Sequence, residues 1–222
     1  MLKPIRHGEL SAPIILVQMV GNHELSLIDS EVISIRKYAG SDFCLLAFKV
    51  DNWNVDLSPW NAPPVFGNEF FGYGAKETFL SVLGELEAIG REKCYYIGGY
   101  SLAGLFALWS AYQTDIFSGV AAASPSIWFP GFMDYMKNHI LQANSVYLSL
   151  GDKEEKTRNP VLAAVGERIR EAHDILCRTG VNCTLEWNRG NHFHEPEIRI
   201  ARAFAWLMND DRVQNHFPSK GY

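Results

Sequence analysis

The sequence predicts a single α/β domain, built on a mostly parallel sheet of about six strands with helices on both faces. Two observations support this prediction. Short apolar runs rich in β-branched and aromatic residues recur six times along the chain, and several segments between them have helical periodicity. Strand and helix therefore alternate to the end of the chain, which is typical of a parallel sheet covered by helices. A length of 222 residues suits one such domain, so we expect residues 1–222 to form a single unit.

The expected strands are short and apolar over most of their length. Runs of this kind, bounded by Gly, Asp or Asn, are typical of strands that are buried on both faces of a sheet. The six runs cover residues 14–20, 43–50, 94–98, 119–123, 145–150 and 183–187.

The expected helices show the period of an amphipathic helix. Residues 76–89 and 198–208 have this period, and residues 105–112 form an apolar helical run. A further helix is expected to bury the apolar residues Leu162, Val165, Ile169, Ala172 and Leu176. Residues 52–74 form a long irregular segment, and long loops of this kind are often functional.

Composition and charge argue against several classes of protein. The formal net charge is −5, the pI is about 5.8, and Lys and Arg form no run that could neutralise successive phosphates, so we expect no nucleic-acid partner. The uncharged stretch 12–20 is shorter than the roughly 20 apolar residues of a membrane span. The N-terminus lacks the pattern of a secretory leader. We therefore expect a soluble, cytoplasmic protein without a membrane partner. The four cysteines do not form a disulfide framework or a zinc motif, and only Cys177 and Cys183 are spaced to pair.

The residues that follow each strand are the candidates for chemistry, because ligands of parallel sheets bind at the carboxyl ends of the strands. The third expected strand is followed by Gly-Tyr-Ser-Leu-Ala-Gly at residues 99–104 and then directly by a helix. A nucleophile elbow has this order and needs small residues two before and two after the serine, where Gly99 and Ala103 stand. The elbow would place the Ser101 hydroxyl at the helix N-terminus, with the Leu102 N–H as an oxyanion donor. In the alternative interpretation, Ser101 is only the N-cap of the helix after a tight turn.

Two later loops carry an acid and a histidine. The fifth expected strand is followed by Gly-Asp-Lys-Glu-Glu at residues 151–155, and the sixth by a loop that contains His192 and His194. Serine, acid and histidine thus occur in the chain order of the α/β-hydrolase triad. Each component has an alternative: the acidic run would also suit a solvated loop, and the two histidines a metal site. We see no third ligand at a suitable spacing, so we expect no metal.

With these residues in view, the chain resembles the esterase family of α/β-hydrolases that includes esterase D-like enzymes and siderophore esterases. The similarity is densest over residues 98–108, which contain the elbow and the first turns of its helix. Further matches lie at residues 122–128 and 147–154. The resemblance implies an α/β-hydrolase fold.

The resemblance also implies the roles of three residues. Ser101 would be the nucleophile, His192 the general base and Glu154 the acid. Asp152 directly follows a glycine and is short, so we expect it to form a turn instead. Catalysis needs a single imidazole, and we expect His192 rather than His194 to supply it, because Gly190 and Asn191 form a flexible turn that can bring the next side chain back over the strand ends.

The sequence departs from the family pattern at its N-terminal end. In relatives the second oxyanion donor lies in the loop after the first strand and carries a His-Gly pair. Here the candidates are Gly21 and Asn22, and no histidine precedes the glycine. Only 13 residues precede the first expected strand, so we expect the antiparallel strands that usually open this fold to be missing.

The expected activity is cleavage of a small-molecule carboxylic ester through an acyl-enzyme, without a cofactor. Trp53, Tyr100 and Trp128 are the candidate substrate-binding residues. The aromatic residues of the long loop would either wall a pocket or cover an open sheet edge: Trp53, Trp60, Phe66, Phe70, Phe71 and Tyr73. Two other functions stay open, a non-catalytic binding or scaffold protein with the same fold and a different acyl-transfer reaction. The sequence does not indicate the oligomeric state.

Overall fold

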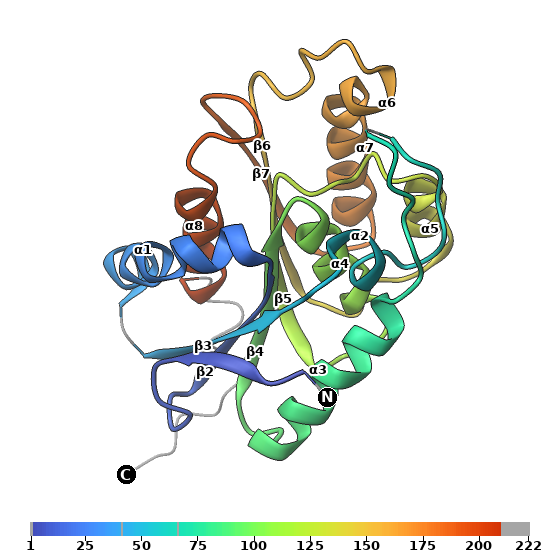
Figure 1. Cartoon of the computed structure of the whole chain (residues 1–222). Coiled ribbons are helices and arrows are strands. Elements are labelled where there is room, and N and C mark those ends of the chain that lie inside the picture. The colour runs from blue at the N-terminus through green and yellow to red at the C-terminus, as the bar shows by residue number, and fades with distance from the viewer. Residues whose placement is uncertain (1, 41, 66, 210–222) are drawn as a thin grey trace.

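The α/β fold is confirmed, with a central, mostly parallel sheet (Figure 1). The computed structural model describes residues 2–40, 42–65 and 67–209. In these residues seven strands form one sheet in the order β1-β3-β2-β4-β5-β6-β7, and only β1 runs antiparallel to its neighbour. The strands are β1 (Pro4–His7), β2 (Ile14–Val20), β3 (Phe43–Lys49), β4 (Cys94–Tyr100), β5 (Phe117–Ala123), β6 (Ser145–Gly151) and β7 (Asn182–Asn188).

Helices cover both faces of the sheet (Figure 1). On one face, α1 and α8 pack against each other and share an apolar cluster with the strands. On the other face, α3, α4, α5 and α7 contribute to a second and larger cluster. The helices of the described residues are α1 (Asn22–Ala39), α2 (Trp53–Asp56), α3 (Ala75–Ile89), α4 (Leu102–Ala111), α5 (Phe132–Asn138), α6 (Pro160–Ala163), α7 (Val165–Arg178) and α8 (Pro196–Met208).

The five inner strands, β2 to β6, are buried and mostly apolar on both sides because both faces of the sheet are covered. In β4, Tyr95 and Ile97 belong to the larger cluster, whereas Tyr96 and Tyr100 belong to the other. This alternation follows from the two-residue period of a strand. The helix that follows β4 is buried at every position, which explains why α4 reads as an apolar run without a polar face.

The strand predictions are confirmed to within two residues at each end, with one addition. The expectation that the opening antiparallel strands are missing is wrong for one of them, because Pro4–His7 pairs antiparallel with β3 at the sheet edge. This strand is short, partly exposed and carries Arg6 and His7, so it has no apolar run to reveal it. Its proline stands at the first position of an edge strand, where a missing N–H costs no ladder bond.

The helix predictions missed α1, α2 and α5, and they joined α6 and α7 into one helix. Ile28, Val32 and Ile35 recur at helical spacing and are the buried face of α1, so the signal was present in the sequence. The predicted helix over residues 162–176 is divided at Ala164, where α6 ends and α7 begins. None of the described helices has both the length and the hydropathy to cross a membrane. The four cysteines, including Cys177 and Cys183, are free thiols.

The sheet topology gathers the carboxyl ends of the parallel strands along one edge. Because β4, β5, β6 and β7 are neighbours, Tyr100, Ala123, Gly151 and Asn188 end side by side. The residues that come directly after Tyr100, Gly151 and Asn188 are the serine, acid and histidine segments of the sequence. The fold therefore brings together three segments that are about 40 to 90 residues apart in the chain.

Candidate active site

Ser101 stands on a strained turn between β4 and α4. Its φ of 59° and ψ of −122° lie in a region that residues with a side chain rarely adopt. A Cβ atom on Gly99 would come within 2.6 Å of Ala103, so the strand and the helix approach too closely for any larger residue. The Ser101 side chain makes no capping hydrogen bond to its helix. These features fit the nucleophile elbow and not the alternative in which Ser101 is a simple N-cap.

The hydroxyl of Ser101 lies in a polar environment. Its Oγ is 3.3 Å from Oγ of Ser126, a buried residue in the loop after β5. The backbone fixes the same two residues, because the Ser126 N–H donates to the Ser101 carbonyl at 3.0 Å. The elbow is thus anchored to the neighbouring strand end.

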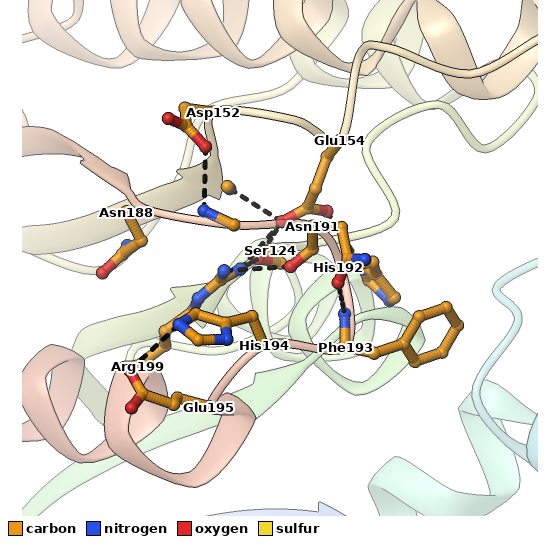
Figure 2. A network of polar contacts seen from close by, with 12 residues as sticks. Ser124, Asp152, Glu154, Asn188, Asn191, His192, Phe193, His194, Glu195 and Arg199 are labelled. Carbon is orange, nitrogen blue, oxygen red and sulfur yellow. Dashed lines mark hydrogen bonds and ion pairs between the residues drawn. The ribbon is translucent and has the colours of Figure 1, made fainter.

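Glu154 is buried and fully engaged in hydrogen bonds (Figure 2). Its side chain is 5% exposed. Its Oε2 lies 2.7 Å from Nδ1 of His192, while its Oε1 accepts from the Ser124 hydroxyl at 2.7 Å and the Gly151 N–H at 2.7 Å. A guanidinium N–H of Arg199 also donates to Oε1, at 2.9 Å. The carboxylate therefore has donors on both oxygens.

The surroundings of Glu154 favour its charged form. Burial by itself raises the pKa of the carboxyl, but the hydrogen bond and charge of His192 and the bonds from Ser124 and Gly151 outweigh burial. The net result is a pKa below the ordinary value. A carboxylate that stays ionised can orient an imidazole and stabilise its protonated form.

His192 is fixed at its ring and at its backbone. Nδ1 is bonded to Glu154, and the carbonyl oxygen accepts from the Tyr100 hydroxyl at 2.7 Å. The Tyr100 ring lies against the imidazole, with 5.2 Å between centroids. Burial, with the nearby charge of Glu154, raises the pKa of Tyr100 to about 12, so its phenol stays protonated and keeps donating. The buried Tyr100 hydroxyl thus supports the histidine loop, and a contact of Tyr100 with substrate stays a prediction.

Asp152 and His194, the neighbouring acid and histidine of the two loops, make other contacts. Asp152 accepts from the Gly190 N–H at 2.8 Å and so ties the acid loop to the histidine loop, instead of bonding within its own turn. His194 points away from the acid, with Nε2 3.5 Å from the Glu195 carboxylate (Figure 2). In the described part of the chain, no three His, Cys, Asp or Glu residues are grouped to hold a metal ion.

The two proposed sources of oxyanion donors differ in what surrounds them. Leu102 is the first residue of α4 and directly follows Ser101, as the elbow requires. Gly21 follows β2, but its N–H donates to the Glu24 carboxylate at 3.0 Å and caps α1. The helix cap thus uses the Gly21 N–H in this structure, and its role as an oxyanion donor stays a prediction. Asn22, the first residue of α1, stays a prediction, as does Leu102.

A pocket of about 940 Å³ opens in front of the serine and the histidine. Trp53 and Trp128, two of the predicted substrate-binding residues, line it together with Phe193. The charged residues Asp51, Glu69, Lys153 and Lys156 also line it. The chemical groups and the apolar walls of the predicted site therefore belong to one cavity.

Two other aromatic residues of the long loop, Trp60 and Phe71, pack in the interior. Trp60 and Phe71 pack against Phe129, with ring centroids 5.7 and 5.2 Å apart. Phe70 and Tyr73 are exposed, and Phe66 lies outside the described residues. Of the described residues in this group, Trp53 alone lines the pocket, and a role of the loop as an aromatic wall stays a prediction.

Sequence reasoning missed Arg199 altogether. Its side chain is 3% exposed and lies on the buried side of α8, four residues before Ala203 and one before Ile200. The signal in the sequence was a charge on the apolar face of an amphipathic helix, and a charge in that place needs a buried partner.

Comparison with known proteins places the fold among the α/β-hydrolases. The siderophore hydrolase EstA from Aspergillus nidulans has a TM-score of 0.66 and 20% identity, over 90% of this chain and 83% of that one. An IroE-like serine hydrolase from Shewanella oneidensis has a TM-score of 0.70 and 14% identity, over 90% and 71%. The carboxylesterase from Bacillus cereus has a TM-score of 0.61 and 16% identity, over 94% and 95%. No protein-family model matches the sequence, and no curated protein sequence does either.

Proposed function

We propose that the chain is a serine hydrolase that cleaves a small-molecule carboxylic ester. The observation that carries the proposal is the convergence, in one pocket, of Ser101 on a strained elbow with a histidine held by a buried carboxylate. The similarity of the fold to that of several esterases supports it.

The first half of the reaction forms an acyl-enzyme. Ser101 Oγ attacks the ester carbonyl carbon while His192 takes the hydroxyl proton, because a serine hydroxyl is a weak nucleophile without a base. With Nδ1 bonded to Glu154, Nε2 is the nitrogen that receives this proton. The negative charge on the carbonyl oxygen is stabilised by the Leu102 N–H at the start of α4. The tetrahedral intermediate then expels the alcohol, which takes the proton from His192.

The second half releases the acid. Water attacks the acyl-Ser101 carbonyl, again with His192 as the base, and Ser101 leaves with the proton. Throughout, Glu154 holds the imidazole in one orientation and stabilises its charged form. Every group in this scheme is a side chain or backbone N–H of the chain itself, so the reaction requires no cofactor.

The walls of the pocket support an ester with an apolar part. Trp53, Trp128 and Phe193 offer aromatic surface beside Ser101, and the volume of about 940 Å³ suits a small molecule. An acyl or alkoxy group without charge would contact these rings. p-Nitrophenyl acetate and butyrate are therefore suitable first substrates.

One observation favours a second candidate, a non-catalytic binding protein with the same fold. The Gly21 N–H, one of the two candidates for the second oxyanion donor, is occupied by Glu24, which leaves Asn22 as the other candidate. Removing one such donor typically costs 10²–10³ in kcat, roughly 3–4 kcal/mol of transition-state stabilisation, and so weakens an enzyme without abolishing it.

Turnover by Ser101→Ala separates the two candidates. We expect the wild type to release p-nitrophenol in a steady-state assay and the variant to fall to background, with an unchanged circular dichroism spectrum. His194→Ala is the matched control and should keep most of the activity. A wild type without measurable turnover would favour the binding protein, and turnover by acyl transfer to an added alcohol would favour the other acyl-transfer reaction.

A further inference from the structure

Arg199 makes five hydrogen bonds, and each one reaches a segment that carries the proposed active site. Nη1 donates to Glu154 Oε1 at 2.9 Å, to the Tyr100 hydroxyl at 3.0 Å and to the Ser124 hydroxyl at 3.1 Å. Nη2 donates to the carbonyls of Arg189 at 3.2 Å and Asn191 at 3.0 Å. A single side chain on α8 thus contacts residues at or just after the ends of four neighbouring strands. Figure 2 shows Arg199 beside Ser124 and Glu154.

The two ends of the guanidinium act on different parts of the site. The Nη1 end fixes Oε1 of Glu154, which leaves Oε2 directed at Nδ1 of His192. The Nη2 end binds the chain on both sides of Gly190, a residue with a φ of 108° in the loop that delivers His192. A planar fork with several fixed donors can hold both partners at once, which a lysine cannot do.

The charged groups of Arg199 and Glu154 are both buried, so water does not stabilise either charge. The side chains of Arg199 and Glu154 are 3% and 5% exposed, so each charge depends on the other and on the surrounding donors. A surface ion pair would suffice if the role were only to join α8 to the sheet, as Arg202 illustrates on the same helix. Arg202 is half-exposed and lies 3.5 Å from the Glu186 carboxylate.

We propose that Arg199 is a positioning residue of the triad, which sets the orientation of the Glu154 carboxylate and of the histidine loop toward each other. It acts through Glu154 and does not touch the reacting atoms. This inference rests on the proposed function for its catalytic meaning, but the geometry that it asserts can be measured without any turnover.

The first test is the hydrogen bond itself. In protein labelled with ¹⁵N-histidine, the proton on Nδ1 of His192 should give a downfield resonance, which His192→Ala removes and so assigns. We expect Arg199→Met to abolish or strongly weaken this resonance, whereas Arg202→Met keeps it. A resonance of unchanged position and intensity in folded Arg199→Met would overturn the proposal.

The second test is kinetic. Displacements of about 1 Å in a catalytic group can cost about 10²-fold, so we expect Arg199→Met to lower kcat for p-nitrophenyl acetate about 10²-fold with little change in KM. Arg199→Lys, which retains the charge and loses the fork, should lose roughly 10-fold. Arg202→Met should stay within about twofold of the wild type, because its substitution does not alter the triad.

A double-mutant cycle shows whether Arg199 acts through Glu154. In a Glu154→Gln background, Arg199→Met should lower kcat by less than about threefold, because the group that it positions is already lost. The full 10²-fold loss in that background would overturn the proposal. The double variant has no buried unpaired charge, so it also supplies a folded protein if Arg199→Met alone does not fold.

The NMR measurement and the kinetic measurement together distinguish a failure of this inference from a failure of the proposed function. If the wild type hydrolyses no ester and the resonance still depends on Arg199, the proposed function fails and the positioning role stands. If turnover depends on Ser101 but neither kcat nor the resonance responds to Arg199→Met, the proposed function stands and the positioning role fails.

Discussion

Two buried carboxyl groups, Glu154 in the loop after β6 and Glu31 on α1, have opposite electrostatic surroundings. Glu154 has donors on both oxygens, from His192, Arg199, Ser124 and Gly151, and its pKa lies below the ordinary value even though burial alone would raise it. Glu31 on α1 is 2% exposed and accepts one hydrogen bond, from Gln18 at 3.2 Å. Among the described residues its Oε1 has no hydrogen-bond partner. Burial raises its pKa to about 8, against an opposing effect of Gln18.

The difference shows that burial does not determine the charge of a carboxyl group in this fold. Removal from water disfavours the anion at both places, and only the supply of charged and polar donors reverses that effect. The donors around Glu154 come from four segments that meet at the carboxyl edge of the sheet. The fold thus maintains a buried anion at the place where the proposed mechanism uses one, and a carboxylic acid at the other.

The largest expected effect is on turnover. Glu154→Gln removes the anion and should lower kcat for p-nitrophenyl acetate roughly 10⁴-fold, as loss of a triad carboxylate typically does. Glu31→Gln should leave kcat unchanged. Steady-state kinetics of the two variants at pH 7.5 checks the prediction, and near-normal turnover in Glu154→Gln would mean that the proposed enzyme works as a Ser–His dyad.

The next effect is on stability at rising pH. The pKa of Glu31 is raised to about 8 from 4.5, so the folded state retains a proton that the unfolded state loses. The free energy of unfolding of the wild type should therefore fall between these pH values, by up to about 1.4 kcal/mol per pH unit from this group.

Glu31→Gln should remove this dependence. Gln resembles the protonated acid, so the variant should match the wild type near pH 4.5 and exceed its stability at pH 8. Urea denaturation at several pH values measures this difference. A difference that does not change with pH would mean that Glu31 is ionised in the folded protein.

A smaller effect of opposite sign is expected for Glu154. Because its folded pKa lies below the ordinary value, its ionisation stabilises the protein above that value, and this contribution is lost as the pH falls through the folded pKa. The stability advantage of the wild type over Glu154→Gln should therefore shrink below about pH 4.5. An advantage that grows on acidification would contradict the assigned direction.

The smallest effect is expected at Asp152. Its Oδ1 accepts from the Gly190 N–H, and an asparagine offers the same acceptor. Asp152→Asn should therefore change kcat by less than about threefold. A collapse of turnover in this variant alone would move the acid of the proposed triad from Glu154 to Asp152.

The sequence could predict the strands and the order of the chemical groups because both leave local patterns. Six strands read as apolar runs, five of them buried, and the residues after them named Ser101, Glu154 and His192, which the structure places in one pocket. The edge strand Pro4–His7 could not be found in this way, because its pairing with β3 and not its composition makes it a strand. Helix α1 had a readable period and was overlooked.

What the sequence did not indicate are hydrogen-bond partners that only the fold brings together. Arg199 lies outside the histidine loop, five residues after His194, and its proposed role depends on contacts with residues at or after four strand ends. The Gly21 N–H is occupied because Glu24 folds back on it as a helix cap, and Tyr100 is turned under the loop by its hydrogen bond to His192. Such assignments need side-chain directions, which spacing in the sequence does not give.

The measurement that tests the account most directly is covalent labelling with a fluorophosphonate, followed by mass mapping of the modified peptide. We predict modification of Ser101, no modification in Ser101→Ala, and a rate of labelling that falls in His192→Ala and Glu154→Gln but not in Glu31→Gln. Absence of labelling in the folded wild type, or modification of a residue other than Ser101, would contradict the assignment of Ser101 as a nucleophile activated by His192 and Glu154.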